Sequence, residues 1–530
     1  MNIFAIGDLN PDIFVYSEKS PKRGIEQKVD CISASIGGNA ANFSMALSGL
    51  GVKTSLISMG AEDSFSSFLK QELARAGVKP LLIKSKNKNA ASVIFVSKDG
   101  ERAIMSSKAA LLEMDCKKVS KILLPNLMKG DIVFFGGFFH LPKMKSGFPK
   151  LLSAIKKKGA SIFFDLCYDE YGSWKIPALE KIDALFLNEL ELKMLTKSAA
   201  KKKAIAKLFS RGSSIIVLKK GKNGAELFSG NRHLESRAIP VKALNATAAG
   251  DFFNAGYAYA FSKGYGEKAS LECANFVAAE KISNEGYQLT SAKKLESHLA
   301  PQNFLELKKF NSYDLLSRAI AGEIMLQLKK KPASVISLAA GSTPLGAYRE
   351  LAKAYREGSA DFSKAYFVEL DEYCGIRNYK DSFAYSLGKN FLGKVNFKKK
   401  NILLFNPDAK NKKKEIARFE NFIRKKGLDF VLLGIGANCH IAFNEPGTRF
   451  SSSTHVEKLK HRAVSKSAFT LGIRTILSAK KIILAASGSK KAMAIRKTFS
   501  SKPDEKIPSS VLQKHRNASA FVDSAAGKLV

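Results

Sequence analysis

Short apolar runs alternate with amphipathic stretches over roughly the first half of the chain. Runs rich in β-branched and aromatic residues predict buried strands, whereas apolar positions three or four residues apart predict helices. Their alternation is typical of a mostly parallel sheet with helices on both faces. Strands are expected at Ile3–Ile6, Thr54–Ser58, Ala91–Val96, Ile132–Phe135, Ser161–Phe164, Ala184–Leu187 and Ser214–Leu218, and helices at Asn42–Leu50, Ser64–Ala76 and Phe252–Ser262. Two polar, strand-like segments near Lys28–Ser33 and Ala91–Ile104 are expected outside that sheet, as a small lid.

A second alternation of helices and strands follows a polar connection at Ser291–Gln302. It begins with a helix expected at Asp314–Leu328. Its strands are expected at Ser334–Leu338, Ala365–Glu369, Ile402–Leu404, Phe430–Ile435 and Lys481–Ala485. A chain of 530 residues is also too long for one hydrophobic core. The pattern therefore predicts two α/β domains, residues 1–298 and 303–530.

Composition and charge narrow the class of protein. A hydrophobic content of 45% with 25% charged residues is ordinary for a soluble globular chain. No apolar run reaches the ~18 residues of a membrane span, and the N-terminus lacks the features of a signal peptide, so a cytosolic location without membrane contact is expected. The net charge of +39 comes from lysines spread along the chain, whereas nucleic-acid binding favours a focused patch. Nucleic acid is therefore not expected as a partner, and a homo-oligomer stays open.

The stretch Asn245–Gly256 (NATAAGDFFNAG) joins a turn of small residues to an apolar helix. The small side chains of Ala248, Ala249 and Gly250 let backbone N–H groups approach an anion, and the helix N-terminus adds its positive field. Asp251, at the mouth of the helix, is placed to take a proton from an attacking hydroxyl. These are the parts of a phosphoryl-transfer site.

The same stretch resembles the second signature of the ribokinase (PfkB) family of sugar kinases, and Ile36–Asn42 (IGGNAAN) resembles the first. Further matches, in order along the chain, are Gly7–Asn10 with Asp12, Gly51, Gly60, Phe164 with Asp165, and Asn188–Glu191. The resemblance covers about residues 1–295. It implies a three-layer α/β domain with a small β lid, ATP as phosphoryl donor, and Mg²⁺.

The resemblance also implies a role for each matching position. Asp251 is implied as the catalytic base. The residues implied to bind sugar hydroxyls are Asp12, Gly38, Asn39 and Asn42; those implied on the ATP and anion side are Lys219, Gly221, Gly224, Ala248, Ala249 and Gly250; those implied to organise Mg²⁺ and phosphate are Asn188 and Glu191.

Two residues of this half depart from the family pattern. Asn245 stands where the family usually has an aspartate associated with monovalent cations, which puts potassium activation in doubt. Ala248 replaces a glycine of the anion-holding turn, and is tolerated only if the backbone there does not need a positive φ.

Three segments of the second half carry candidate chemistry. Ala340–Gly346 (AGSTPLG) follows an apolar strand and offers backbone N–H groups and hydroxyls to a phosphate. Glu369–Tyr373 (ELDEY) follows the next strand and supplies carboxylates at a strand's carboxyl end, where α/β ligands bind. His440, in an otherwise apolar segment, titrates near neutral pH, and Glu445 is placed to orient and charge-stabilise it.

These segments, with Gly488–Ala492 (GSKKA), resemble the glucosamine-6-phosphate deaminase/isomerase family from about residue 312 to 528. The run HIAFNEP favours the deaminases over the related 6-phosphogluconolactonases, and a Rossmann-like α/β domain is implied. By the resemblance Asp371 is the proton-transfer base and His440 the ring-opening acid–base, with no cofactor. Glu445 and Asn438 are implied to support His440, and the phosphate is implied to lie against Gly341, Ser342, Thr343 and Lys491.

This half also departs from its family. Asn438 occupies a position that is aspartate in many members, and we expect its amide to orient His440. Cys439 replaces a glycine. The segment from Lys458 to Thr470 is short, and Arg462 is the candidate to replace the phosphate-binding arginine that it often supplies. Glu372 is expected to be a solvated neighbour with only a supporting role.

Together the two halves predict a bifunctional enzyme of amino-sugar catabolism. The kinase would phosphorylate glucosamine at its 6-hydroxyl, and the deaminase would convert glucosamine 6-phosphate into fructose 6-phosphate and ammonia. Two alternatives stay open. The kinase could act later, on fructose 6-phosphate or another sugar, with Lys28 and Arg102 as candidate phosphate ligands. One half could also be a degenerate, ligand-sensing module.

Overall fold

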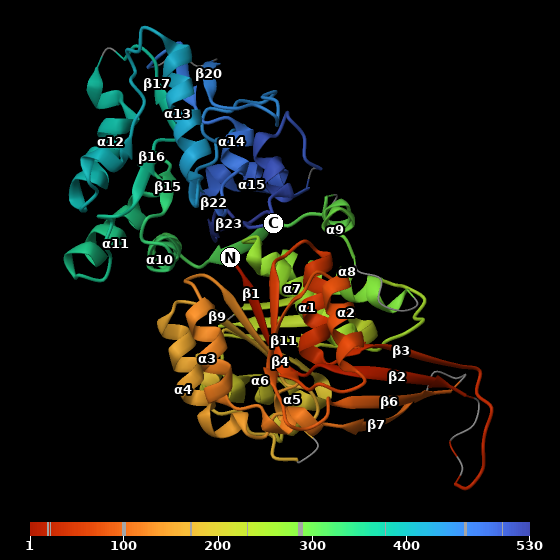
Figure 1. The fold of residues 1–530 in the computed structure, drawn as a ribbon. Helices are drawn as coiled ribbons and strands as arrows, with labels where there is room; N and C mark the ends of the chain where they lie inside the picture. The colour runs from red at the N-terminus through yellow and green to blue at the C-terminus, as the bar shows by residue number, and fades with distance from the viewer. Residues whose placement is uncertain are drawn as a thin grey trace. The chain divides into compact units, whose positions relative to one another are not determined.

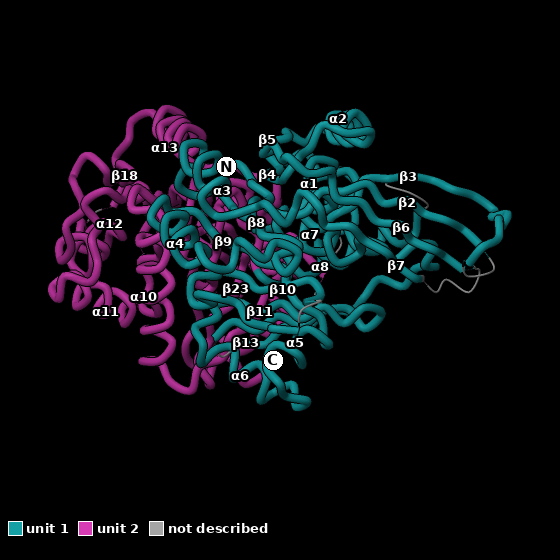
Figure 2. The backbone as a smooth tube through the Cα atoms, turned by 60° about the horizontal axis from the view of Figure 1, so that its bottom comes forward, with its two compact units in different colours: residues 1–263, 267–300 teal, residues 264–266, 301–530 magenta. Residues whose placement is uncertain are grey.

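The computed structural model describes residues 1–17, 21, 23–97, 102–169, 172–230, 232–284, 290–300, 302–376, 378–459, 464–500 and 502–530. The chain divides into two compact units (Figure 2). The first comprises residues 1–263 and 267–300, and the second residues 264–266 and 301–530. Each unit is an α/β domain with helices on both faces of a sheet (Figure 1).

A nine-stranded sheet forms the centre of the first unit, in the order β13-β12-β11-β10-β9-β8-β1-β4-β5. Its strands are parallel except for β12 and β13, which pair antiparallel at one edge. The bounds are β1 Ile3–Gly7, β4 Thr54–Gly60, β5 Lys79–Lys84, β8 Ile132–Gly136, β9 Ser161–Asp165, β10 Ala184–Asn188, β11 Ile215–Lys219, β12 Ala225–Ser229 and β13 Arg232–Ser236. All seven expected strands are present, and Ala91–Val96 lies in a separate sheet, as expected for the lid segment near Ala91–Ile104.

Alternate residues of each central strand point to opposite helical layers, as a fully buried sheet requires. Phe135 and Phe164 face a core shared with α3 to α6. Their neighbours Phe134 and Phe163 face the other layer, where Phe134 stacks on Phe43 of α1 and Phe163 meets Tyr257 of α7. The helices are α1 Asn39–Gly49, α2 Ser66–Arg75, α3 Cys116–Asn126, α4 Met144–Lys157, α5 Glu189–Thr196, α6 Lys201–Ser210, α7 Ala249–Ser262, α8 Glu267–Ile282 and α9 Ala292–Leu299.

The lid is a four-stranded sheet in the order β3-β2-β6-β7. Its strands are β2 Asn10–Tyr16, β3 Cys31–Gly37, β6 Ala91–Val96 and β7 Arg102–Ser107. They extend away from the helical layers in Figure 1. The β2 strand begins three residues after β1 ends, so the lid is joined directly to the carboxyl edge of the central sheet.

The second unit is built on a seven-stranded parallel sheet, in the order β14-β23-β22-β19-β15-β16-β18. Its strands are β14 Glu306–Phe310, β15 Val335–Leu338, β16 Tyr366–Val368, β18 Ile402–Leu403, β19 Phe430–Leu433, β22 Ile482–Ala486 and β23 Ala518–Asp523. A small antiparallel sheet adds β17 Asp371–Tyr373, β21 Ser467–Thr470 and β20 His455–Lys458. The five expected strands are all present, and β14 and β23 extend the sheet beyond them.

Two separate cores cover the faces of this sheet. Ile336 and Leu432 face α10, α11 and α12, whereas Val335 and Val431 face α13, α14 and α15. The helices are α10 Tyr313–Lys330, α11 Leu345–Arg356, α12 Phe383–Asn390, α13 Lys412–Lys426, α14 Ile473–Leu477 and α15 Ala492–Ser500. None of the described helices of either unit is long and apolar enough to cross a membrane.

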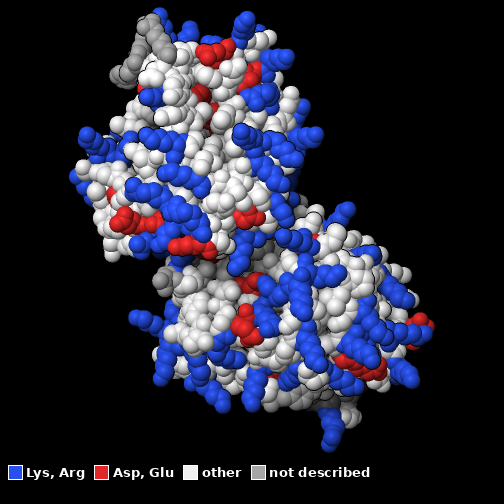
Figure 3. Space-filling model, turned by 90° about the vertical axis from the view of Figure 1, so that its left-hand side faces the viewer, with Lys and Arg blue, Asp and Glu red and all other residues white. Residues whose placement is uncertain are grey.

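Lysine and arginine side chains are spread over the visible faces of both units, with acidic residues among them (Figure 3). A nucleic-acid site would gather them along one stripe or groove. The visible distribution is that of a solvated basic surface.

Candidate active sites

The first site lies at the N-terminus of α7. Ala248 precedes the helix with φ 63°, and Asp251 is the third helical residue, 6% exposed. Asn245 shapes the approach, because its Oδ1 accepts the N–H of Thr247 at 2.8 Å. The turn therefore presents backbone N–H groups and the positive end of the helix next to a buried carboxylate.

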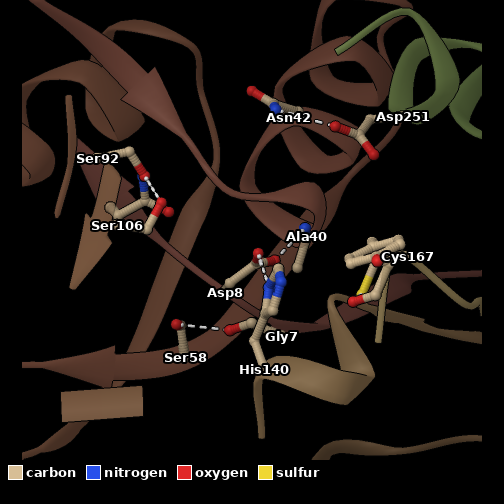
Figure 4. A network of polar contacts seen from close by, with 12 residues as sticks. Gly7, Asp8, Ala40, Asn42, Ser58, Ser92, Ser106, His140, Cys167 and Asp251 are labelled. Carbon is tan, nitrogen blue, oxygen red and sulfur yellow. Dashed lines mark hydrogen bonds and ion pairs between the residues drawn. The ribbon is translucent and has the colours of Figure 1, made fainter. Parts of the chain in front are cut away.

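Asp251 is held by an asparagine from the neighbouring helix. Asn42 Nδ2 donates to Asp251 Oδ2 at 2.9 Å (Figure 4). Burial and the charge of Asp165 raise the pKa of Asp251 well above its ordinary value, against the opposing effect of Asn42. Asn42 Oδ1 is buried and has no hydrogen-bond partner among the described residues. An orphaned acceptor of this kind is satisfied by a ligand hydroxyl or ammonium.

A second buried cluster lies beside the same turn. Lys219 Nζ donates to both oxygens of Asp165, at 3.0 and 3.2 Å, and Asn254 Nδ2 donates to Asp165 at 2.6 Å. Burial alone would lower the pKa of Lys219, but Asp165 and Glu191 outweigh it and raise that pKa. A Cβ on Gly250 would lie 3.4 Å from Lys219 Nζ. A fixed positive charge is thus held next to the anion-binding turn.

The acceptor side of the site is formed where β1 leads into the lid. Asn10 Nδ2 donates to Asp12 Oδ1 at 2.6 Å, and burial raises the pKa of Asp12 to about 6. Gly38 precedes α1 with φ 99°, and a Cβ there would lie 2.5 Å from the carbonyl oxygen of Asp8. Asn39, half-buried, is the first residue of α1. All of these residues lie at the carboxyl edge of the sheet.

The residues expected on the nucleotide side follow β10 and β11. Gly221 has φ 55° and Gly224 φ 85°, and a Cβ on Gly224 would lie 2.1 Å from a backbone oxygen of β13, so glycine is required there. Asn188 and Glu191 form a capping box on α5: Asn188 Oδ1 accepts the N–H of Glu191, and Glu191 Oε2 accepts that of Asn188, both at 2.8 Å. Each side chain therefore also has a structural function.

In the second unit, the segment after β15 forms an exposed loop that ends at α11. Tyr313 fixes this loop, because its hydroxyl donates to the carbonyl of Thr343 at 3.0 Å and accepts the N–H of Gly346 at 2.8 Å. A Cβ on Gly346 would lie 2.1 Å from Ser317 Oγ, so only glycine lets α11 approach α10 here. Gly341 and Ser342 are exposed at the carboxyl edge of the sheet, where they are able to meet a phosphate.

Three acidic residues follow β16 and differ in their surroundings. Burial and the charge of Glu372 raise the pKa of Asp371, which is 8% exposed, to about 8. Glu372 accepts hydrogen bonds from the Ser382 hydroxyl at 2.6 Å and from the Ala384 N–H at 2.9 Å, at the start of α12. Glu369 Oε2 accepts the Phe405 N–H at 2.7 Å. Glu369 and Glu372 are held by these hydrogen bonds, so Asp371 is the candidate for proton transfer among the three.

The segment after β19 forms a tight turn around a histidine. His440 Nδ1 lies 3.2 Å from Glu445 Oε1, and Asn438 Nδ2 donates to Glu445 Oε2 at 2.8 Å. A Cβ on Gly436 would lie about 2.4 Å from the imidazole, so glycine leaves room for the ring. Burial lowers the pKa of His440, while Glu445 acts in the opposite direction. The charge of Lys491 also lowers the pKa of His440. The Nζ of Lys491 donates to the carbonyl of Ile435 at 2.7 Å.

Backbone contacts join the strand of Asp371 to the turn of His440. Asp371 lies opposite Thr470 in the β17–β21 pair. The Phe443 N–H donates to Thr470 Oγ1 at 3.2 Å, and Asn444 Nδ2 donates to the carbonyl of Leu471 at 2.9 Å. The segments that carry Asp371 and His440 are therefore held together by one small sheet.

Comparisons with known proteins identify the family of each unit. A sequence profile described as pfkB family carbohydrate kinase matches residues 1–294, and one described as glucosamine-6-phosphate isomerases/6-phosphogluconolactonase matches residues 311–521. A glucosamine-6-phosphate deaminase of Clostridium novyi is 39% identical over 241 residues, 42% of this chain and 100% of that protein. One of Thermoanaerobacter sp. is 36% identical over 234 residues, 41% of this chain and 92% of that protein. The chain belongs to both families.

A solved structure of another protein has the same fold as the kinase unit. The adenosine kinase of Sinorhizobium meliloti matches with a TM-score of 0.50 and 18% identity, over 56% of this chain and 99% of that one. This likeness concerns the fold alone. The chain is thus a two-domain enzyme, with a PfkB carbohydrate kinase domain followed by a glucosamine-6-phosphate isomerase-family domain.

Three sequence-based expectations change with the structure, and a fourth falls on a residue that the structure does not describe. Ala248 was expected only if the backbone there did not need a positive φ, but its φ is 63°. Cys439, which also stands in place of a family glycine, has φ 71°. Glu372 is fully buried and anchors α12, so it is not a solvated neighbour. Asn438 binds the backbone N–H of His440 at 3.2 Å and the carboxylate of Glu445, not the imidazole. Arg462 lies outside the described residues.

Sequence reasoning missed three residues of these sites. His140 contacts Asp8, Asn254 contacts Asp165, and Tyr313 holds the phosphate loop. Asn254 was detectable, since it lies three residues after Asp251 and therefore close to it on one side of the helix. His140 and Tyr313 are separated from their partners by long stretches of chain, and no local pattern marks them.

Proposed function

We propose that the chain catalyses two consecutive steps, the phosphorylation of glucosamine by ATP at the 6-hydroxyl and the deamination of glucosamine 6-phosphate to fructose 6-phosphate and ammonia. The observation that carries the proposal is a buried carboxyl group in each unit, Asp251 and Asp371, at the edge of a sheet that also carries a loop suited to an anion. The relatives of the second unit that bear the name glucosamine-6-phosphate deaminase support the second step. The first step supplies the substrate of the second.

In the kinase step, Asp251 would take the proton of the 6-hydroxyl as that oxygen attacks the γ-phosphorus and ADP leaves. The N–H groups of the turn from Ala248 to Asp251 and the positive end of α7 favour the charge of the transferred group. Asn42 orients the carboxylate of Asp251. Lys219, held by Asp165, adds a cation beside the turn.

The residues present fit ATP and Mg²⁺. Gly224 has no room for a side chain, Lys219 and Gly250 lie side by side at the turn, and Glu191 is a buried carboxylate near Lys219. Mg²⁺ prefers oxygen ligands, so Glu191 and Asn188 would hold it directly or through water. When bound, the metal neutralises charge on the phosphates.

In the deamination step, His440 would move the proton between the ring oxygen and the C1 hydroxyl as the pyranose opens. Ionised Asp371 would then take the C2 proton and return it to C1, while the aldehyde oxygen gains a proton and the amino nitrogen loses one, which leaves a hydroxyl at C1 and an imine at C2. Water hydrolyses this imine, so that ammonia leaves and the ketone of fructose 6-phosphate forms. Asn438 and Glu445 hold the His440 turn, and the phosphate would lie against Ser342, Thr343 and Lys491.

Ammonia release tests both steps. The full chain would be given glucosamine 6-phosphate, and then glucosamine with and without ATP and Mg²⁺. Release from glucosamine only with ATP supports the proposed order. Release from glucosamine 6-phosphate alone redirects the kinase to fructose 6-phosphate or another sugar, and release from neither favours a sensing role for the second unit.

A further inference from the structure

A hydrogen-bonded pair that the proposed kinase step does not use, Asp8 and His140, lies next to the residues expected to bind the acceptor. Asp8 directly follows β1, and His140 follows β8, the neighbouring strand. His140 Nδ1 lies 3.1 Å from Asp8 Oδ2, and the Ala40 N–H donates to Asp8 Oδ1 at 3.2 Å (Figure 4). A Cβ on Gly137 would lie 2.5 Å from Asp8 Oδ1. The carboxylate of Asp8 is therefore fixed from three sides.

Asp8 is ionised at neutral pH. Burial alone would raise its pKa, but the hydrogen bond and charge of His140 and the N–H of Ala40 outweigh burial and lower it. Lys108 acts on Asp8 in the same direction. Asp8 in turn raises the pKa of both Asp12 and Asp251. It therefore lies within electrostatic range of Asp12, which is expected to bind the sugar, and of Asp251, the proposed base.

An independent feature of the same site calls for a hydrogen-bond donor. Asn42 is 4% exposed, its Nδ2 is used by Asp251, and its Oδ1 has no partner among the described residues. Figure 4 shows the Asn42–Asp251 contact and the Asp8–His140 contact in one view, with the hydrogen-bonded pair of Ser92 and Ser106 beside them. Carboxylates and an amide oxygen are acceptors, so the site is suited to a ligand rich in donors.

We propose that Asp8, oriented by His140, is the specificity-determining residue of the kinase acceptor site and that, with Asp12, it binds the ammonium group of a hexosamine. This inference rests on the proposed function, since it names the chemical class of the acceptor for the same site. A neutral hexose offers a hydroxyl where the hexosamine offers a cation, and only the cation adds the attraction between two opposite full charges to its hydrogen bond with the carboxylate. A phosphorylated acceptor would bring negative charge beside Asp8 and Asp12, which disfavours fructose 6-phosphate.

The test compares kcat/KM for glucosamine, glucose and fructose 6-phosphate in the full chain and in Asp8→Asn. We expect the parent to prefer glucosamine over glucose, and Asp8→Asn to lower kcat/KM for glucosamine by about ten- to a hundred-fold while that for glucose changes little. Equal losses on both sugars would overturn the proposal, because they would mean a structural role. A parent that prefers glucose or fructose 6-phosphate would overturn it as well.

A matched control separates recognition from helix capping. Asp115 Oδ1 accepts the Lys118 N–H at 2.8 Å in the first turn of α3, much as Asp8 accepts that of Ala40 in α1. Asp115→Asn should leave the preference for glucosamine unchanged. Ammonia release from glucosamine 6-phosphate should be normal in both variants, which shows that the second unit is folded, and a nearly unchanged kcat/KM for glucose shows the same for the kinase unit.

His140 is a positioning residue in this proposal, and two substitutions test it. Asn at this position keeps a nitrogen donor near that of Nδ1, whereas Leu keeps the volume and removes the donor. His140→Leu should reduce the ratio of glucosamine to glucose turnover, and His140→Asn should restore most of it. A ratio that neither change moves would overturn the role of His140. If the parent phosphorylates none of these sugars while the deaminase is active, the proposed kinase function fails instead.

Discussion

The two active sites solve one problem, how a buried carboxylate exchanges a proton, in two different environments. Asp251 receives a hydrogen bond from Asn42, and Asn42 and the cation of Lys219 oppose burial and the charge of Asp165, which together still raise its pKa well above the ordinary value. Among the described residues no such opposing group acts on Asp371, and burial and the negative charge of Glu372 raise its pKa to about 8. The oxygens of Glu372 are meanwhile committed to the start of α12.

The difference follows from what each base has to do. In the kinase the base takes one proton, and nearby cations and N–H groups are needed for the phosphates in any case. In the proposed deamination a single carboxyl group, that of Asp371, takes a proton from one carbon and returns it to the next. A group that acts in both directions works best when its pKa lies near the working pH, which a pKa of about 8 satisfies.

The largest expected effect comes from removing each base in turn. Asp251→Asn should lower ATP-dependent phosphorylation by about 10²–10⁴-fold and leave deamination intact, and Asp371→Asn should do the reverse, because general-base catalysis contributes about that much. ADP formation and ammonia release, measured on the same samples, check both. If either change eliminates both activities in a chain that keeps its circular-dichroism spectrum, the two sites are not independent.

A smaller effect is expected from the amide beside His440. Asn438→Asp would replace the donor to Glu445 Oε2, now at 2.8 Å, by a second carboxylate. Like charges at this distance repel and raise each other's pKa, so the turn around His440 should loosen. Ammonia release should fall about ten-fold, the equivalent of one lost charge-assisted hydrogen bond.

Asn406→Asp serves as the control for this change. Asn406 Oδ1 accepts the N–H two residues on, at 3.1 Å, as Asn438 Oδ1 does. Aspartate can accept that bond equally well, and deamination should be unchanged. A higher rate in Asn438→Asp than in the parent would mean that the aspartate common in the family is the better residue here too.

The raised pKa of Asp371 also predicts a pH-dependent stability. The folded chain keeps a proton on this group up to about pH 8, whereas the unfolded chain releases it near 3.8. This group therefore contributes stability that is fully present below pH 3.8 and is lost as the pH rises through about 8. Asp371→Asn removes that loss, so its second unit should melt about 5 °C higher than the parent at pH 8, with a smaller difference at pH 5. Equal differences at both pH values would contradict the assignment.

Much of the fold follows from the sequence, because buried parallel strands leave a strong local signal. Runs such as Ile132–Phe135 and Phe430–Ile435 identified central strands within a few residues. The last two strands at one side of each sheet, β12 with β13 and β14 with β23, were not identified, although residues such as Ala225, Leu227 and Ala520 are fully buried. Their flanking positions are partly polar, so that only tertiary packing determines them.

The sites were predictable where residues follow strands and less so where geometry decides. Asp165 and Lys219 end β9 and β11, and the carboxyl edge of a parallel sheet brings such residues together. The pair of Asp8 and His140 spans 132 positions in the chain and could not be found from spacing. Because the family has a glycine at position 248, the sequence raised the question of whether Ala248 has a positive φ. Only the structure gives that angle.

The smallest expected effect concerns this backbone strain, which both sites share at Ala248 and Cys439. The left-handed conformation costs a non-glycine residue roughly 1–2 kcal/mol, and a glycine there avoids this cost. Part of that gain in stability is lost because glycine gives the unfolded chain more conformational freedom. Ala248→Gly should therefore stabilise the kinase unit by about 0.5–1 kcal/mol, measured by chemical denaturation. Ala154→Gly, inside α4, should instead destabilise it by about 1 kcal/mol. A loss of stability in Ala248→Gly would mean that the turn relaxes to a negative φ in solution, and the geometry of the anion site at α7 would then need revision.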